Sequence, residues 1–97
     1  MRLILTFLTA LTAIAASAQD TSLTVRGRVT DASTDEPVPF ASVHLEGTMV
    51  GVSTDAEGEY VITIPENGAL IFSSIGYRSK EVNIDGRTTL DISLEPD

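Results

Sequence analysis

Apolar and polar residues alternate in short segments along most of this sequence, and turn-forming residues separate the segments. In Leu23–Val29, for example, apolar or small side chains occupy every second position, and Thr24, Arg26 and Arg28 fall between them. Side chains of a strand alternate between two faces, so the pattern predicts strands with one buried and one wet face, as antiparallel sheets have. Six further strands are expected at Ala41–Glu46, Thr48–Ser53, Tyr60–Ile64, Ala69–Ile75, Arg78–Ile84 and Thr88–Leu94.

The number and spacing of these strands define the fold class. No helical period follows residue 18, and turn signals recur at regular intervals. This predicts an all-β domain, a seven-stranded Greek-key β-sandwich, with a small closed barrel as the alternative architecture. The residues expected to form its core are Val25, Val29, Val43, Leu45, Tyr60, Ile62, Phe72, Val82, Leu90 and Ile92.

The stretch Thr54–Tyr60 is predicted to be the turn around which the domain is organised. The Asp55 side chain can accept a hydrogen bond from a backbone N–H two residues on. Gly58 can adopt a positive φ without steric cost. A second structural turn is expected at Gly76 and Tyr77, where the tyrosine ring is buried and its hydroxyl returns to a backbone group.

Residues 1–18 have the three parts of a secretory signal peptide. Arg2 supplies the positive charge, an apolar run follows, and Ala16-Ser17-Ala18 is a small-residue cleavage site. The apolar run is shorter than the roughly 20 residues of a membrane-spanning helix, so no membrane-spanning segment is expected after cleavage. We therefore expect a signal peptide at 1–18, a lead-in at 19–24 and one domain at 25–95.

The charge of the chain restricts its partners. Removal of the signal would leave five basic and 14 acidic residues, a net charge of −9. Such an acidic domain is not expected to bind nucleic acid, and it favours protein partners whose facing surface is basic. The chain contains no cysteine, so its stability depends on the apolar core and not on disulfides.

No catalytic, cofactor-binding or metal-binding residues are predicted. His44 is the single histidine and is interpreted as a surface residue of a strand. Asp55, Glu57 and Glu59 offer spaced oxygens, but they lack the spacing of an EF-hand loop, and a calcium site needs six to eight oxygen ligands. They are interpreted as one turn former and two solvated side chains. We expect a protein that is not an enzyme and has no cofactor.

An ordered series of short motifs resembles a known family. The motifs are Gly27–Asp31, Glu36–Val43, Gly47–Thr48, Thr54–Tyr60, Ile75–Tyr77 and Leu94–Pro96. Together they resemble the carboxypeptidase regulatory-like domain, in the form found at the N-terminus of TonB-dependent outer-membrane transporters of the starch-utilisation type. The resemblance implies a prealbumin-like (transthyretin-like) sandwich, and it implies no peptidase activity, because this module is accessory in carboxypeptidases.

The resemblance also implies a place and a role. We expect a non-catalytic accessory or interaction module of the cell envelope, located in the periplasm or associated with the outer membrane. Its expected partner is an envelope protein such as an outer-membrane transporter, and the module itself is expected to be a monomer. The chain ends at Asp97, without plug or barrel segments, so transport by the chain alone is not expected. The alternatives are a carbohydrate- or calcium-binding module, and a truncated fragment of a transporter gene.

Overall fold

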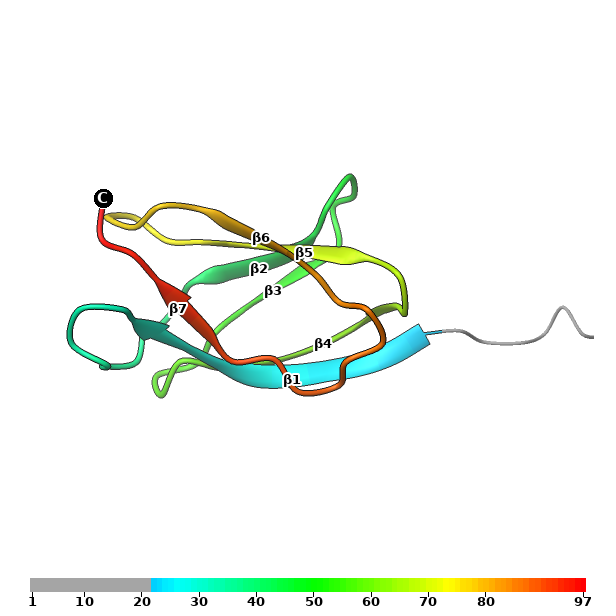
Figure 1. The fold of residues 1–97 in the computed structure, drawn as a ribbon, viewed down its shortest axis with the longest axis horizontal. Helices are drawn as coiled ribbons and strands as arrows, with labels where there is room; N and C mark the ends of the chain where they lie inside the picture. The colour runs from blue at the N-terminus through cyan, green and yellow to red at the C-terminus, as the bar shows by residue number, and fades with distance from the viewer. Residues whose placement is uncertain (1–21) are drawn as a thin grey trace, which may run out of the picture.

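The computed structural model describes residues 22–97, which form two β-sheets packed over one core (Figure 1). No helix occurs within this range. Two separate sheets agree with the predicted sandwich rather than with a closed barrel. The strands are β1 (Ser22–Asp31), β2 (Ser42–Leu45), β3 (Gly51–Ser53), β4 (Glu59–Pro65), β5 (Ala69–Ser73), β6 (Lys80–Asn83) and β7 (Ile92–Leu94).

The N-terminal part of the chain enters the fold earlier than expected. The signal peptide predicted at residues 1–18 lies outside the described residues. The lead-in was expected at 19–24, but β1 already begins at Ser22. It does so because β4 is long enough to pair with it there, with Ser22 opposite Pro65 and Thr24 opposite Thr63.

β1 lies at the centre of a three-stranded sheet with the order β4-β1-β7. It pairs with β4 in the antiparallel sense and with β7 in the parallel sense, Val29 lying opposite Ile92. The parallel pair differs from the antiparallel sheets that the alternation favoured. It arises because the chain reaches β7 from β6, which belongs to the other sheet, and parallel neighbours need such a crossover connection.

The second sheet has the order β3-β2-β5-β6, and every neighbouring pair is antiparallel. β5 ends at Ser73, two residues before the predicted end at Ile75. A turn interrupts it there, because the Tyr77 N–H bonds to the Ser74 carbonyl oxygen at 3.0 Å and Gly76 has φ 90°. Ile75, expected within the strand, is instead fully exposed at 100%.

Other strands are also shorter than predicted. β3 begins at Gly51 and not at Thr48, because the N–H and the hydroxyl of Thr48 both bond to the Leu45 carbonyl oxygen and close a turn. The predicted strand at 78–84 is reduced to β6. The last strand was expected from Thr88 but begins at Ile92, although the backbone at 88–90 still bonds to Arg26 of β1.

The core lies between the sheets. Eight of the ten predicted core residues are buried; Leu45 and Val82 are partly buried and pack against that core. Phe72 is the largest fully buried side chain, and the Tyr60 ring meets it edge-on with centroids 5.5 Å apart. The buried residues that the prediction omitted are Val38, Ala41, Ile64, Leu70, Ile84 and Leu94.

Within residues 22–97 there is no helix with the length and hydropathy needed to cross a membrane.

Candidate functional site

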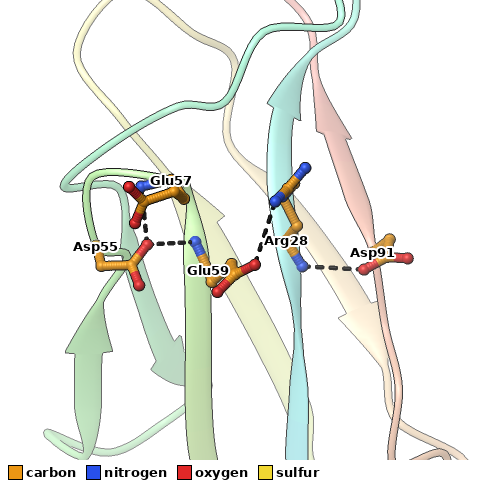
Figure 2. Close-up of polar contacts among 5 residues, drawn as sticks. All are labelled: Arg28, Asp55, Glu57, Glu59 and Asp91. Carbon is orange, nitrogen blue, oxygen red and sulfur yellow. Dashed lines mark hydrogen bonds and ion pairs between the residues drawn. The ribbon is translucent and has the colours of Figure 1, made fainter.

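The turn that joins β3 to β4 is closed by the side chain of Asp55. Its Oδ1 atom accepts hydrogen bonds from the N–H groups of Glu57 and Glu59, both at 2.9 Å (Figure 2). The backbone closes the same turn, because the Gly58 N–H donates to the Asp55 carbonyl oxygen at 2.9 Å. Gly58 has φ 78°, the left-handed conformation that glycine adopts without strain.

The turn is also held against β1. The N–H of Val29 donates to the Gly58 carbonyl oxygen at 2.8 Å. A Cβ atom at Gly58 would lie 2.6 Å from the Val29 carbonyl oxygen, closer than real Cβ contacts allow. Glycine is therefore required at this position both for its φ and for the close approach of two backbones. The turn fixes where β4 begins and how it meets β1.

Charged side chains form a band next to this turn, on the outer face of the three-stranded sheet (Figure 2). An Arg28 Nη atom and a Glu59 Oε atom make an ion pair at 3.1 Å, and the two side chains are 49% and 56% exposed. At such exposure the pair contributes little to stability. The Arg28 N–H donates to Asp91 Oδ1 at 2.9 Å, so Asp91 satisfies a backbone donor just before β7 begins to pair.

A shallow hollow of about 560 Å³ lies over this face. Outward-facing side chains of both charge signs line it, with Arg26 and Arg28 from β1 beside Glu59 and Asp91. Val61 adds an apolar side chain that is 51% exposed. A lining of this kind suits contact with polar protein groups, and its carboxylates are engaged with the protein's own N–H groups and guanidinium.

The residues considered for metal or proton chemistry do not come together. No group of three or more His, Cys, Asp and Glu side chains within the described part of the chain is placed to hold a metal ion. Asp55 uses Oδ1 to accept two backbone N–H groups. His44 lies half-buried on β2 of the other sheet, where its neighbours across the ladder are Gly51 and Ile71.

The second predicted turn residue, Tyr77, has a different partner from the one expected. Its hydroxyl donates to Asp31 Oδ2 at 2.7 Å, a side-chain carboxylate at the end of β1 and not a backbone group. This hydrogen bond, together with N–H bonds from Ser33 and Thr34 to Oδ1, lowers the pKa of Asp31 below its usual range. The same bond raises the pKa of Tyr77.

The tyrosine that does bond to a backbone group is Tyr60. Its hydroxyl donates to the Leu90 carbonyl oxygen at 2.6 Å from inside the core. Burial of the phenol raises its pKa well above the ordinary value.

Sequence reasoning overlooked Thr54 as a structural residue. Apart from Tyr60, it is the only buried side chain with a polar group among the described residues, at 1% exposure. Its hydroxyl donates to the Val38 carbonyl oxygen and accepts from the Ala41 N–H, both at 2.8 Å, and so fixes the loop before β2. The available signal was its position directly before Asp55, because a hydroxyl beside a tight turn often bonds to nearby backbone.

Most of the described part of the chain matches a known family. Residues 25–97 match the family described as the CarboxypepD_reg-like domain. The chain belongs to this family. The family's match covers every strand after the start of β1, including the Asp55 turn and the band of charges beside it.

Curated proteins similar to this chain include TonB-dependent receptors. TonB-dependent receptor P26 of Formosa agariphila is 40% identical over 60 residues, which are 62% of this chain and 6% of that protein. TonB-dependent receptor P39 of the same organism is 38% identical over 60 residues, 61% of this chain and 6% of its own length. TonB-dependent receptor SusC of Bacteroides thetaiotaomicron is 36% identical over 62 residues, 64% of this chain and 6% of its own length. The chain thus spans only a small part of each relative.

Proposed function

We propose that this chain is a non-catalytic, exported interaction module of the cell envelope that acts with a TonB-dependent transporter. The observation that carries the proposal is that curated proteins similar to this chain are named as TonB-dependent receptors. Proteins named as TonB-dependent receptors contain the region as about 6% of their length, so in them it is one small part of a much larger chain. We infer that so small a part of a large receptor acts by contacting other protein segments.

The sequence of residues 1–18 supports a location in the cell envelope. We propose that they direct export and are removed between Ala18 and Gln19, leaving a lead-in and the domain at 25–95 in the periplasm or at the outer membrane. We also propose the Greek-key, prealbumin-like form of the sandwich for this domain. Its support is the crossover of the chain from β6 in one sheet to β7 beside β1 in the other.

The geometry of the outer face supports a contact role over a catalytic one. Asp55, Glu59 and Asp91 accept bonds from the protein's own groups, as a structural carboxylate does. Arg28 pairs with Glu59, and its N–H bonds to Asp91, so the band presents charged groups of both signs, which suits recognition of a protein surface. The module is therefore proposed to position a neighbouring segment without changing it chemically.

The proposal is tested by expressing the tagged full-length chain in a host that has TonB-dependent transporters. We expect an exported species whose intact mass lacks the first 18 residues, and co-isolation with a transporter after cross-linking in the envelope. A variant without residues 2–18 is the control and should stay inside the cell. Micromolar binding of a defined glycan or of calcium, without any transporter in the cross-linked fraction, would replace the proposal by the ligand-binding alternative.

A further inference from the structure

The two sheets have four edge strands, and two of these edges are covered. Beside β7, the Lys80 ammonium donates to the Ser93 carbonyl oxygen at 3.3 Å, and the Arg78 N–H donates to the Glu95 carbonyl oxygen at 2.8 Å. On β6, the Arg87 guanidinium donates to the Asn83 carbonyl oxygen. Carbonyl oxygens that could accept hydrogen bonds from an added strand are thus occupied by the protein's own cations and N–H groups.

The third edge strand, β3, is protected by its length. It comprises only Gly51–Ser53, and very short edge strands are a common means of preventing edge-to-edge pairing.

The fourth edge strand, β4, is seven residues long and lies at the end of its sheet, with β1 as its neighbour on one side. The Glu59 carbonyl oxygen accepts from the Asp55 N–H, so the backbone groups of Glu59 point away from β1. Backbone groups alternate in direction along a strand, so those of Val61 and Thr63 also point away from β1. The opposite strand agrees, because the N–H groups of Arg26 and Arg28, which lie across from Val61 and Glu59, bond on the β7 side.

The side chains of Val61 and Thr63 on this edge are not of the kinds that usually prevent pairing with another strand. Val61 and Thr63 are β-branched and uncharged, and both are exposed on the outer face. Proteins commonly place lysine, proline or a bulge on an edge that must not pair, but here proline appears only at Pro65, where the strand ends. The window between the Asp55 turn and Pro65 therefore presents two N–H and two C=O groups, one pair on Val61 and one on Thr63.

We propose that the free edge of β4 at Val61 and Thr63 binds an extended, lysine- or arginine-bearing segment of an envelope protein as an added strand. This rests on the proposed function for the location of the partner. Outer-face side chains of an added strand would lie beside Glu59, Val61 and Thr63, and its inner-face side chains would lie beside Tyr60 and Ile62, which are buried. An added strand in which basic and apolar residues alternate would place its basic side chains on the outer face and its apolar side chains on the inner face.

Charge decides between a different protein and a second copy of this chain. The full chain has a formal net charge of −8, so two copies repel, whereas a basic segment is attracted. The exposed carboxylate of Glu57 at the start of the window adds to this preference, because its side chain projects from the turn beside the edge (Figure 2). The occupant is therefore a basic segment of another protein.

The test measures backbone amide hydrogen exchange by NMR, with a synthetic nine-residue peptide that alternates lysine and valine as the probe. We expect the peptide to slow exchange at Val61 and Thr63 at least tenfold, and a peptide with glutamate in place of lysine to have no effect. Slowing by both peptides alike, or no slowing at millimolar peptide, would overturn the proposal. Slowing without peptide that increases with protein concentration would also overturn it, in favour of self-pairing.

Two variants and a matched control locate the site. Val61→Pro removes one outward N–H at an edge position where proline is tolerated, and it should abolish the effect of the lysine peptide. Val61→Lys keeps the N–H and adds a like charge, and it should weaken binding several-fold even if the proline variant does not fold. Glu81→Pro is the control, because its N–H points away from β5 on the covered β6 edge, and it should bind as the parent does. Unchanged binding by both Val61 variants would overturn the proposed site.

The same variants separate this inference from the proposed function. If the exported parent and Val61→Pro co-isolate equally with a transporter, the β4 edge is not the docking site, although the proposed function stands. If the parent itself does not co-isolate, the proposed function fails whatever the peptide does. Co-isolation of the parent and of Glu81→Pro, but not of Val61→Pro, supports both.

Discussion

The hydroxyl of Tyr60 donates a 2.6 Å hydrogen bond to the backbone carbonyl oxygen of Leu90. The bond joins β4 to the segment that precedes β7, on the opposite side of the central strand β1. Tyr60→Phe would leave this buried acceptor without its partner, so we expect a loss of about 1–3 kcal/mol in the free energy of unfolding. Urea denaturation measures it, and Tyr77→Phe is a control expected to cost less, because the Tyr77 side chain is only partly buried.

The same tyrosine predicts a dependence of stability on pH. Burial raises the pKa of Tyr60 in the folded protein above its unfolded value, so folding disfavours the phenolate. The stabilising contribution is complete below the unfolded pKa, near 10.0, and is lost as the pH rises above it. Unfolding midpoints measured from pH 8 to pH 11 should fall more steeply for the parent than for Tyr60→Phe. Parallel curves for the two proteins would contradict the assignment.

Gly27 of β1 lies against the same Leu90 carbonyl group. A Cβ atom there would be 1.9 Å from the carbonyl oxygen, and that oxygen belongs to backbone that cannot rotate away. Gly27→Ala should therefore destabilise the domain by about 1–3 kcal/mol or more, as overpacking of a core does. Gly68→Ala is the comparison, because its Cβ would meet the movable end of the Leu45 side chain. Equal losses at the two sites would argue against the close approach.

The central turn predicts a difference between adjacent positions. Gly58 has φ 78° and faces the Val29 carbonyl oxygen, whereas Glu57 is exposed. Gly58→Val should cost roughly 1–3 kcal/mol from backbone strain alone, with the steric clash in addition. Glu57→Val should stay within ~0.5 kcal/mol, as exposed substitutions usually do. Thermal unfolding of both variants tests this, and similar midpoints would remove the central role given to the turn.

Phe72 tests the core. Its side chain is completely buried and meets Tyr60 edge-on. Phe72→Ala should cost ~3–5 kcal/mol, which is a large part of the stability of so small a domain, and the variant is expected to be unfolded or nearly so. Phe72→Leu should retain the fold with a smaller loss. A loss below about 1 kcal/mol for the alanine variant would place the ring outside the core.

The hydrogen bond between Asp31 and Tyr77 predicts that the stability of the domain decreases at low pH. The hydrogen bond from the Tyr77 hydroxyl lowers the pKa of Asp31 in the folded state. Its stabilising contribution is therefore present above the unfolded pKa and is lost as the pH falls through the lower folded value. Carboxyl-carbon NMR titration should show the Asp31 pKa rising toward its ordinary range in Tyr77→Phe. An unchanged titration would mean that the N–H groups of Ser33 and Thr34 alone hold the carboxylate.

The alternation of apolar and polar residues predicted the all-β class and most of the core. Alternation placed Val25, Val29 and Val43 in the core because each has polar neighbours on both sides. The all-β class and the family resemblance followed from the same strands and turns.

The remaining features depend on groups that are distant in the sequence. The hydroxyl of Tyr77 bonds to Asp31, 46 positions away, and alternation carries no information about such a partner. The parallel pairing of β7 with β1 likewise depends on how the chain crosses between sheets. Ile75 is β-branched and apolar, as strand residues often are. The chain turns at Gly76, which has a positive φ, and the Ile75 side chain is left exposed.

The cations that cover β6 and β7 also limit how many copies of this protein can associate. Growth of a continuous sheet from one molecule to the next requires two receptive edges per molecule, one for each neighbour. Lys80 and Arg87 occupy acceptors beside β7 and on β6, and β3 is only three residues long, so β4 is the edge that is best suited to receive a strand. A strand added at β4 would therefore occupy the receptive edge of its sheet, and the covered β7 edge at the other end would not support growth from one molecule to the next.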